Sequence, residues 1–250
     1  MKIPLEDSYL DIIGKTQRGL KLQPIPEPSS EIEIRSIAKQ LNLGGEALVA
    51  ASKQAWYPQT QEPIEGLLCY STTFEDMTVN SYLIFDPVTK IAAAFDTGAD
   101  CSGMLHSGLK IEQIFITHIH PDHIIDLARL QTSTGAKTYV SDREPIENAE
   151  IFSDGKTFSI GGLKIETRRS SGHAKGGVTF FITGLKKPIA IVGDALFAGS
   201  MGGGMVSFEE ALKTTRENIL SLPEETIVCS GHGPLTTVGE EKKNNPFFTK

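Results

Sequence analysis

After about residue 65, the chain alternates short apolar runs with segments in which apolar residues recur every three or four positions. This alternation predicts an α/β domain, because short apolar runs are typical of buried strands and the longer repeat is typical of amphipathic helices. The expected strands are 67–72, 79–85, 91–95, 113–117, 164–169, 178–183, 188–192 and 226–229, and the expected helices are 101–107, 122–131 and 207–220.

The first 55 residues follow a different pattern. Helices are expected at 8–19, 31–41 and 46–55, and the proline-rich stretch 24–28 cannot continue a helix. Residues 35–48 are weakly similar to the end of a repressor-type helix-turn-helix domain, although the proline stretch interrupts the usual pair of helices. We interpret 1–55 as a helical N-terminal segment of degenerate helix-turn-helix-like character, 56–65 as a linker and 66–250 as the main domain.

Composition narrows the classes of function. The sequence is 39% hydrophobic and 22% charged, which is ordinary for a soluble globular protein. Its formal net charge is -7 and it lacks a basic run, so neither nucleic acid nor a membrane is an expected partner. No stretch is long enough to span a bilayer, and three widely separated cysteines imply no disulfide framework. We expect a cytoplasmic protein that acts on a small-molecule substrate, and a homodimer stays open.

Five of the six histidines fall into one pattern that suits a metal centre. Residues 117–123 read T-H-I-H-P-D-H and directly follow an apolar run, so they occupy the loop at the end of an expected strand, where α/β sheets usually bind ligands. Further downstream the chain has Gly172-His173, Gly193-Asp194 and Gly231-His232-Gly233-Pro234. Imidazoles and carboxylates together suit Zn, Fe or Mn, and the absence of Cys from the set argues against a closed structural zinc site.

These motifs, in this order, resemble the metallo-β-lactamase superfamily over residues 66–250. The segments Met77-Thr78-Val79-Asn80-Ser81 and Phe95-Asp96-Thr97-Gly98 are similar to the opening strand and the aspartate turn of that family. The C-terminal Gly-His-Gly-Pro and Asn245-Pro246-Phe247 resemble the glyoxalase II-like branch. The resemblance implies an αββα four-layer sandwich, here with a small helical N-terminal extension.

The resemblance also implies which residues bind metal. His118, His120 and His173 would bind a first ion, Asp122, His123 and His232 a second, and Asp194 would bridge both. Asp122 and Asp194 are the candidate catalytic carboxylates. Asp96 would support the site from outside the ligand set, and an ordinary turn aspartate is the alternative reading. Two divalent ions are expected, with zinc favoured and iron or manganese as alternatives.

The function expected from this site is hydrolysis of a thioester or a related small acyl substrate, as in hydroxyacylglutathione hydrolase. Metal-bound hydroxide would be the nucleophile, and the sequence has no G-x-S-x-G motif that would supply a serine instead. The chain departs from many relatives at the glycine run 201–204, a candidate flexible rim or plain surface loop, and at Ala174. Residues that bind the substrate are therefore not assigned.

Two alternatives stay open. A mononuclear Fe(II) held by His118, His173 and Asp194 would suit an oxidoreductase resembling persulfide dioxygenase. A metabolite-sensing regulator that binds DNA through its N-terminal segment is the second alternative, and otherwise that segment is a helical cap or a dimerisation element.

The ligand assignment predicts opposite outcomes for two substitutions. Asp194→Asn should remove most activity because it weakens the bridge shared by both ions, while His106→Ala, outside the pattern, should leave activity nearly intact. The measurement is kcat/KM of both variants on one substrate. Equal losses in the two variants would contradict the assignment.

Overall fold

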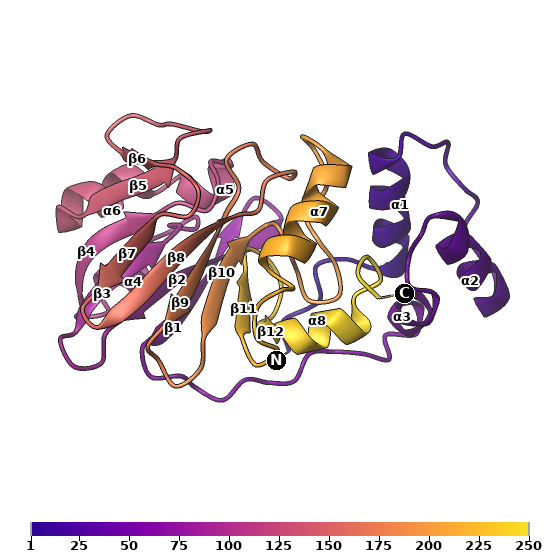
Figure 1. The fold of residues 1–250 in the computed structure, drawn as a ribbon, viewed down its shortest axis with the longest axis horizontal. Helices are drawn as coiled ribbons and strands as arrows, with labels where there is room; N and C mark the ends of the chain where they lie inside the picture. Colours follow the sequence, from indigo (N-terminus) through magenta and orange to yellow (C-terminus); the bar gives the residue numbers. More distant parts are fainter. Residues whose placement is uncertain (1, 250) are drawn as a thin grey trace.

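The strands of the main domain pair into two sheets that face each other in the computed structural model, which describes residues 2–249 (Figure 1). The first sheet runs in chain order and contains β1 (Leu67–Phe74), β2 (Met77–Phe85), β3 (Ile91–Phe95), β4 (Lys110–Phe115), β5 (Lys137–Ser141) and β6 (Glu150–Phe152). Its strands β3 to β6 are parallel to one another, whereas β1 and β2 pair antiparallel.

The second sheet has the order β12-β11-β10-β9-β8-β7. Its strands are β7 (Thr157–Ile160), β8 (Leu163–Arg169), β9 (Val178–Thr183), β10 (Ile189–Gly193), β11 (Ile227–Ser230) and β12 (Thr236–Thr237). All its neighbours pair antiparallel except β10 and β11, which are parallel. Because parallel strands end at the same edge, the loops after β10 and β11 emerge side by side.

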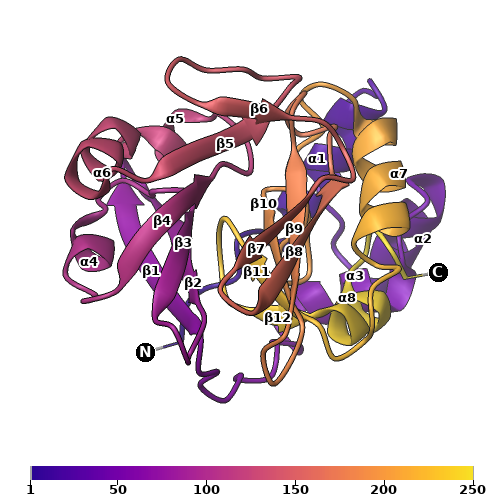
Figure 2. The same cartoon turned by 60° about the vertical axis from the view of Figure 1, so that its left-hand side comes forward.

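Successive side chains along a strand point alternately to the core between the sheets and to the core between a sheet and its covering helices. In β3, Ala93 and Phe95 belong to the core between the sheets, while Ala92 and Ala94 pack outward. The outer face of the first sheet is covered by α4 (Ser102–Leu105), α5 (Pro121–Ile124) and α6 (Leu127–Thr134), and that of the second by α7 (Phe208–Asn218) and α8 (Val238–Asn244). Figure 2 shows the resulting order of helix, sheet, sheet and helix, so the expected αββα sandwich is confirmed.

The N-terminal segment forms α1 (Tyr9–Gly19), α2 (Glu31–Gln40) and α3 (Gly45–Ser52), and the side chains of Ser8 and Ser30 cap the first two helices. The apolar faces of the three helices share one core with α7 and the C-terminal Phe247. They lie at the end of the molecule beyond α7 in Figure 1. The division into segment, linker and main domain stays a prediction.

Several elements differ from the expectations. The continuous helix expected at 122–131 is wrong, since α5 ends at Ile124 and a new helix starts after Asp126. The Asp126 carboxylate accepts a hydrogen bond from the Cys101 backbone nitrogen at 2.8 Å, which holds this break against the loop before α4. Strands β5, β6, β7 and β12 and helix α8 were not expected. Polar and apolar residues mix without a clear period in β5 and α8, and β6, β7 and β12 are only two to four residues long.

Among residues 2–249, none of the helices combines the length and the apolar character that crossing a bilayer requires.

A buried carboxylate in α8 gives a prediction about stability. Glu241 is fully buried and accepts hydrogen bonds from Thr236 Oγ1 (2.7 Å), the Gly199 nitrogen (3.0 Å) and Asn245 Nδ2 (2.8 Å). Burial raises the pKa of the Glu241 carboxyl to about 7, although these hydrogen bonds lower it. A carboxyl whose pKa is higher in the folded than in the unfolded protein stabilises the fold at low pH, and this contribution is lost as pH rises towards the folded pKa.

Glu241→Gln keeps the shape and removes the ionisation. Relative to the wild type, the variant should gain up to about 3 kcal/mol of unfolding free energy between pH 4.5 and 7 and no more above that range. Urea denaturation over this pH range measures the difference. Glu225→Gln, at an exposed position, is the matched control. A Glu241→Gln difference that does not change with pH would show that the carboxyl has an ordinary pKa.

Candidate metal centre

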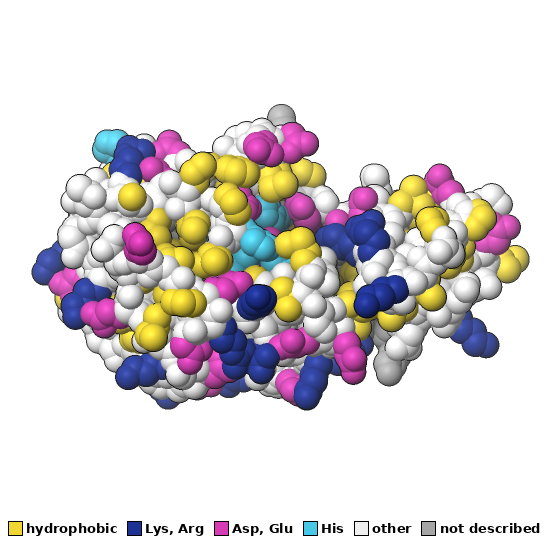
Figure 3. Space-filling model, turned by 90° about the horizontal axis from the view of Figure 1, so that it is seen from above, with side chains coloured by type: hydrophobic (Ala, Val, Ile, Leu, Met, Phe, Trp, Pro, Cys, Tyr) yellow, Lys and Arg dark blue, Asp and Glu magenta, His cyan; other side chains and the backbone are white. Residues whose placement is uncertain are grey.

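The candidate ligands come together at the edge of the sandwich where strands of both sheets end. His118, His120, Asp122 and His123 follow β4, and Asp194 and His232 follow the parallel strands β10 and β11. His173 lies in the connection between β8 and β9. In Figure 3, histidine side chains are visible in a hollow in the middle of one face, with hydrophobic side chains beside them. His120 and His173 are half-buried and the other five candidate side chains are buried.

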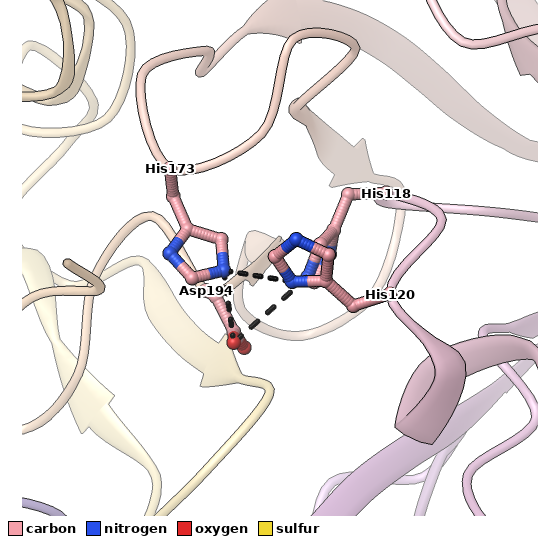
Figure 4. Close-up of side chains that lie close together, drawn as sticks. All are labelled: His118, His120, His173 and Asp194. Carbon is pink, nitrogen blue, oxygen red and sulfur yellow. Dashed lines mark hydrogen bonds and ion pairs between the residues drawn. The ribbon is translucent and has the colours of Figure 1, made fainter. Parts of the chain in front are cut away.

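A first group consists of His118, His120, His173 and Asp194, whose ligand atoms all lie within 4.8 Å of one another (Figure 4). His120 Nδ1 is 3.0 Å from Nε2 of both His118 and His173. Asp194 Oδ2 is 3.4 Å from His173 Nε2 and 3.9 Å from His118 Nε2. Four donor atoms therefore point at one small volume.

A second group consists of Asp122, His123 and His232. Asp122 Oδ2 lies 3.3 Å from His232 Nε2 and 3.4 Å from His123 Nε2. Asp194 reaches this group as well, with Oδ1 3.3 Å from His123 Nε2 and Oδ2 3.4 Å from His232 Nε2. Its carboxylate thus faces both groups at once, which is the geometry that the expected bridging role requires.

Gly193 allows this placement of Asp194. Its φ is +52°, a conformation that residues with a Cβ rarely adopt, and a Cβ there would lie 2.8 Å from Cβ of Thr117. The glycine therefore lets the end of β10 approach the loop that carries His118.

The donor set fits divalent metal ions. Within residues 2–249, His123 Nε2 and Asp194 Oδ1 are buried atoms that have no hydrogen-bond partner, and they lie 3.3 Å apart. Buried polar atoms are normally satisfied, so these two atoms indicate a missing electrophile. Imidazole nitrogen and carboxylate oxygen are ligands that Zn, Fe and Mn accept.

Each of four histidines has its second ring nitrogen held by the protein. The contacts are His118 Nδ1 to Thr117 Oγ1 (3.0 Å), His123 Nδ1 to Asp96 Oδ2 (2.8 Å), His173 Nδ1 to the Gly203 carbonyl (2.9 Å) and His232 Nδ1 to the Thr78 carbonyl (2.7 Å). These contacts leave Nε2 of each ring free to bind a cation, and such outer contacts orient metal ligands in general. Of these four partners, only Asp96 was expected.

Asp96, which follows β3, is hydrogen-bonded to the T-H-I-H-P-D-H segment that follows β4. Its φ is +55°, and its carboxylate accepts hydrogen bonds from the Thr117 nitrogen and Oγ1, both at 2.7 Å, in addition to that from His123. Thr117 Oγ1 in turn accepts from His118 Nδ1. One carboxylate outside the ligand set therefore orients a ligand in each group.

The buried histidines and carboxylates of the site shift one another's pKa values. Burial opposes ionisation of Asp194, yet the charge of His123 and the close contacts with His123 and His232 hold its pKa well below the usual range. Burial lowers the pKa of His123, but Asp194 and Asp96 outweigh it and raise that pKa to about 10. For His118, burial and the charge of His123 lower the pKa well below its usual value. The carboxylates therefore require positive charge beside them, which divalent ions would supply.

Two other expectations concern residues around the site. His106 is exposed at the end of α4, where its Nδ1 lies 2.8 Å from the Ser102 carbonyl, as expected for a histidine outside the pattern. The interpretation of 201–204 as a surface rim is wrong for its first half, since Met201 and Gly202 are buried. Thr117, Thr78 and Gly203 were not identified from the sequence, and two of them act through backbone carbonyls that carry no side-chain signal.

Comparison with known proteins identifies related sequences and folds. The sequence model of the metallo-beta-lactamase superfamily matches residues 75–232, which include all seven candidate ligands. An uncharacterised protein of Mycobacterium tuberculosis is 27% identical over 211 residues, which cover 69% of this chain and 93% of that protein. A hydroxyacylglutathione hydrolase of Methylobacterium nodulans is 31% identical over 209 residues, or 66% of this chain and 81% of the relative. The crystal structure of the BLEG-1 B3 metallo-beta-lactamase is similar with a TM-score of 0.64 and 28% identity, over 73% of this chain and all of that one.

The Asp96 contacts give a prediction about metal affinity. Asp96→Asn would place an amide donor against the donors of His123 or Thr117, so affinity for the ion at the second group should fall by about 10- to 100-fold. Competition with a chromogenic chelator measures this affinity. Asp100→Asn is the matched control, because Asp100 is a neighbouring exposed aspartate that contacts Ser102 and Arg129 instead. Unchanged affinity in Asp96→Asn would contradict the orienting role.

Proposed function

Because the chain belongs to the metallo-beta-lactamase superfamily, we propose that it is a binuclear metal-dependent hydrolase that cleaves a thioester or a related small acyl substrate. The observation that carries the proposal is the Asp194 carboxylate, which faces both groups of candidate ligands. In this proposal His118, His120 and His173 hold one ion, Asp122, His123 and His232 hold the other, and Asp194 is shared. Zinc is the favoured metal, with iron or manganese as alternatives.

Two bound ions would supply Lewis acidity, which activates water near neutral pH and polarises an acyl carbonyl. Asp194 would be shared between the two ions, while Asp96, Thr117, Thr78 and Gly203 orient the histidines that would hold them. His120 and His173 are half-buried whereas the other candidate ligands are buried, so a substrate would approach from the side of these two histidines.

Buried thiols do not offer an alternative nucleophile. Burial raises the pKa of the Cys101 thiol to about 12 and that of Cys229 well above its ordinary value, so neither forms a thiolate at neutral pH. Activated water is therefore the nucleophile that suits this site. A thioester is proposed because thiolate is a good leaving group, and the relative from Methylobacterium nodulans, named hydroxyacylglutathione hydrolase, supports this class.

The first test is the metal content of protein purified anaerobically without added metal or chelator. We expect close to two ions of Zn, Fe or Mn per chain. A screen of acyl thioesters, read by release of free thiol, should then find a substrate whose hydrolysis is lost on metal removal and restored by reloading.

Two results would contradict the proposal. One iron per chain, together with oxygen uptake on a persulfide, would favour the mononuclear oxidoreductase that uses His118, His173 and Asp194. A protein that contains no metal and cannot be reloaded would show that the centre is not functional. His106→Ala serves as the control variant in all assays, since it removes a histidine that lies outside both groups.

A further inference from the structure

The backbone of residues 200–203 lies directly behind the first group of candidate ligands. The Gly203 carbonyl accepts the hydrogen bond from His173 Nδ1 at 2.9 Å. Gly202 is buried, and a Cβ at this position would lie 2.9 Å from His173 Nδ1 and would overlap the Asp194 carbonyl. Because no space separates this backbone from His173 and Asp194, a displacement of the loop would displace His173.

The C-terminal helix region anchors one side of this loop. Asn245 Nδ2 donates to the Ser200 carbonyl at 2.8 Å, and the Glu241 carboxylate accepts from the Gly199 nitrogen at 3.0 Å. Glu241, Asn245 and Ser200 are all buried. This side of the loop is therefore fixed by hydrogen bonds that water does not reach.

The N-terminal segment anchors the other side. Ser200 Oγ donates to the Asp7 carboxylate, and Lys15 Nζ donates both to that carboxylate and to the Met201 carbonyl, the latter at 3.0 Å. The Lys15 and Asp7 side chains are only 16% and 8% exposed. The Met201 side chain is buried in the core that α1 shares with α7.

An ion pair in this position does more for geometry than for stability. Desolvation of the two charges offsets much of their attraction, but the pair fixes the atoms that it contacts. Lys15 donates to Asp7 on its own segment and to the carbonyl of Met201, which is 186 residues away in the chain. Asp7 accepts hydrogen bonds from both Lys15 and Ser200 of the loop. Both residues lie outside the matched stretch 75–232.

We propose that Lys15 and Asp7 are positioning residues of the metal centre, which hold the loop 200–203 so that the Gly203 carbonyl orients His173 as a ligand of the first ion. The inference rests on the proposed metal centre and assigns a role in that centre to the N-terminal segment. Because the loop is hydrogen-bonded to His173, a ligand of the first group, Lys15 and Asp7 should affect metal binding at the first group more than at the second group.

The test compares metal affinity at each group in the full chain. The affinity for Co²⁺ is measured by competition with a chelator in two backgrounds, His232→Ala, which weakens the second group, and His120→Ala, which weakens the first. Lys15→Met should lower the affinity about 10-fold in the His232→Ala background, as expected for loss of an outer contact, and change it little in the His120→Ala background. The visible spectrum of the bound Co²⁺ should change in the first background only.

Variants of the same segment separate positioning from folding. Lys15→Arg retains donors for Asp7 and the Met201 carbonyl and should restore most of the affinity. Lys53→Met is the matched control, because it breaks the ion pair with Glu31 inside the same helical segment and touches neither the loop nor the site. Ser200→Ala, which removes only the hydroxyl donor to Asp7, replaces Lys15→Met if that variant does not fold, and should also weaken the first group.

Equal weakening of both groups by Lys15→Met, an equal effect of Lys53→Met, or unchanged affinity would overturn the proposal. The measurement of Co²⁺ affinity requires no substrate, so it tests the role of Lys15 and Asp7 even if the thioester screen finds no substrate. Loss of Co²⁺ binding in every background, with unmodified Lys15 and Asp7, would instead contradict the proposed metal centre itself.

Discussion

The buried carboxylate of Asp194 is the constraint on which the arrangement of the site depends. A carboxylate removed from water is costly unless positive charge and hydrogen-bond donors surround it. The fold places Asp194 at the end of β10, where its two oxygens face histidines from both sheets. The surrounding histidines therefore cannot be exchanged for apolar residues without leaving that charge uncompensated, and cations at the two groups would compensate it more fully than the imidazoles alone.

The candidate ligands lie on short loops, but the groups that orient them come from distant parts of the chain. Thr78 belongs to the first antiparallel pair of strands, Asp96 follows β3, and Gly203 follows β10. Each contributes one hydrogen bond to a different imidazole. The two sheets must consequently pack in a fixed relative position before the rings can point at common volumes, and the large aromatic core between the sheets, with Phe95, Phe115 and Phe180 in mutual contact, provides that rigidity.

Periodicity alone predicted an α/β domain. The family resemblance, carried by the T-H-I-H-P-D-H run and the three glycine-flanked residues, implied the sandwich and the grouping of the candidate ligands. The sequence was insufficient for the contacts that orient them. Thr78 and Gly203 act through carbonyls, which every residue has, and Thr117 was visible only as the first letter of the run. Strands such as Lys137–Ser141 were missed because polar and apolar residues do not alternate along them. The break between α5 and α6 depends on Asp126 reaching Cys101, a contact between distant positions that no local pattern reports.

The N-terminal segment could be recognised as helical from its sequence, but its relation to the site could not be predicted. Its three short helices expose apolar faces that need a partner, since helices of this length gain most of their stability from packing. The partner is the outer layer of the second sheet, where Phe208 of α7 and the C-terminal Phe247 complete the cluster. Once the helices are docked there, Lys15 lies next to the carbonyl of Met201, 186 residues away in the chain. The segment needs only an apolar surface in order to fold, yet once docked it holds the loop 200–203 beside the candidate metal ligands. Neither its helical pattern nor its weak helix-turn-helix likeness would suggest this role for Lys15 and Asp7.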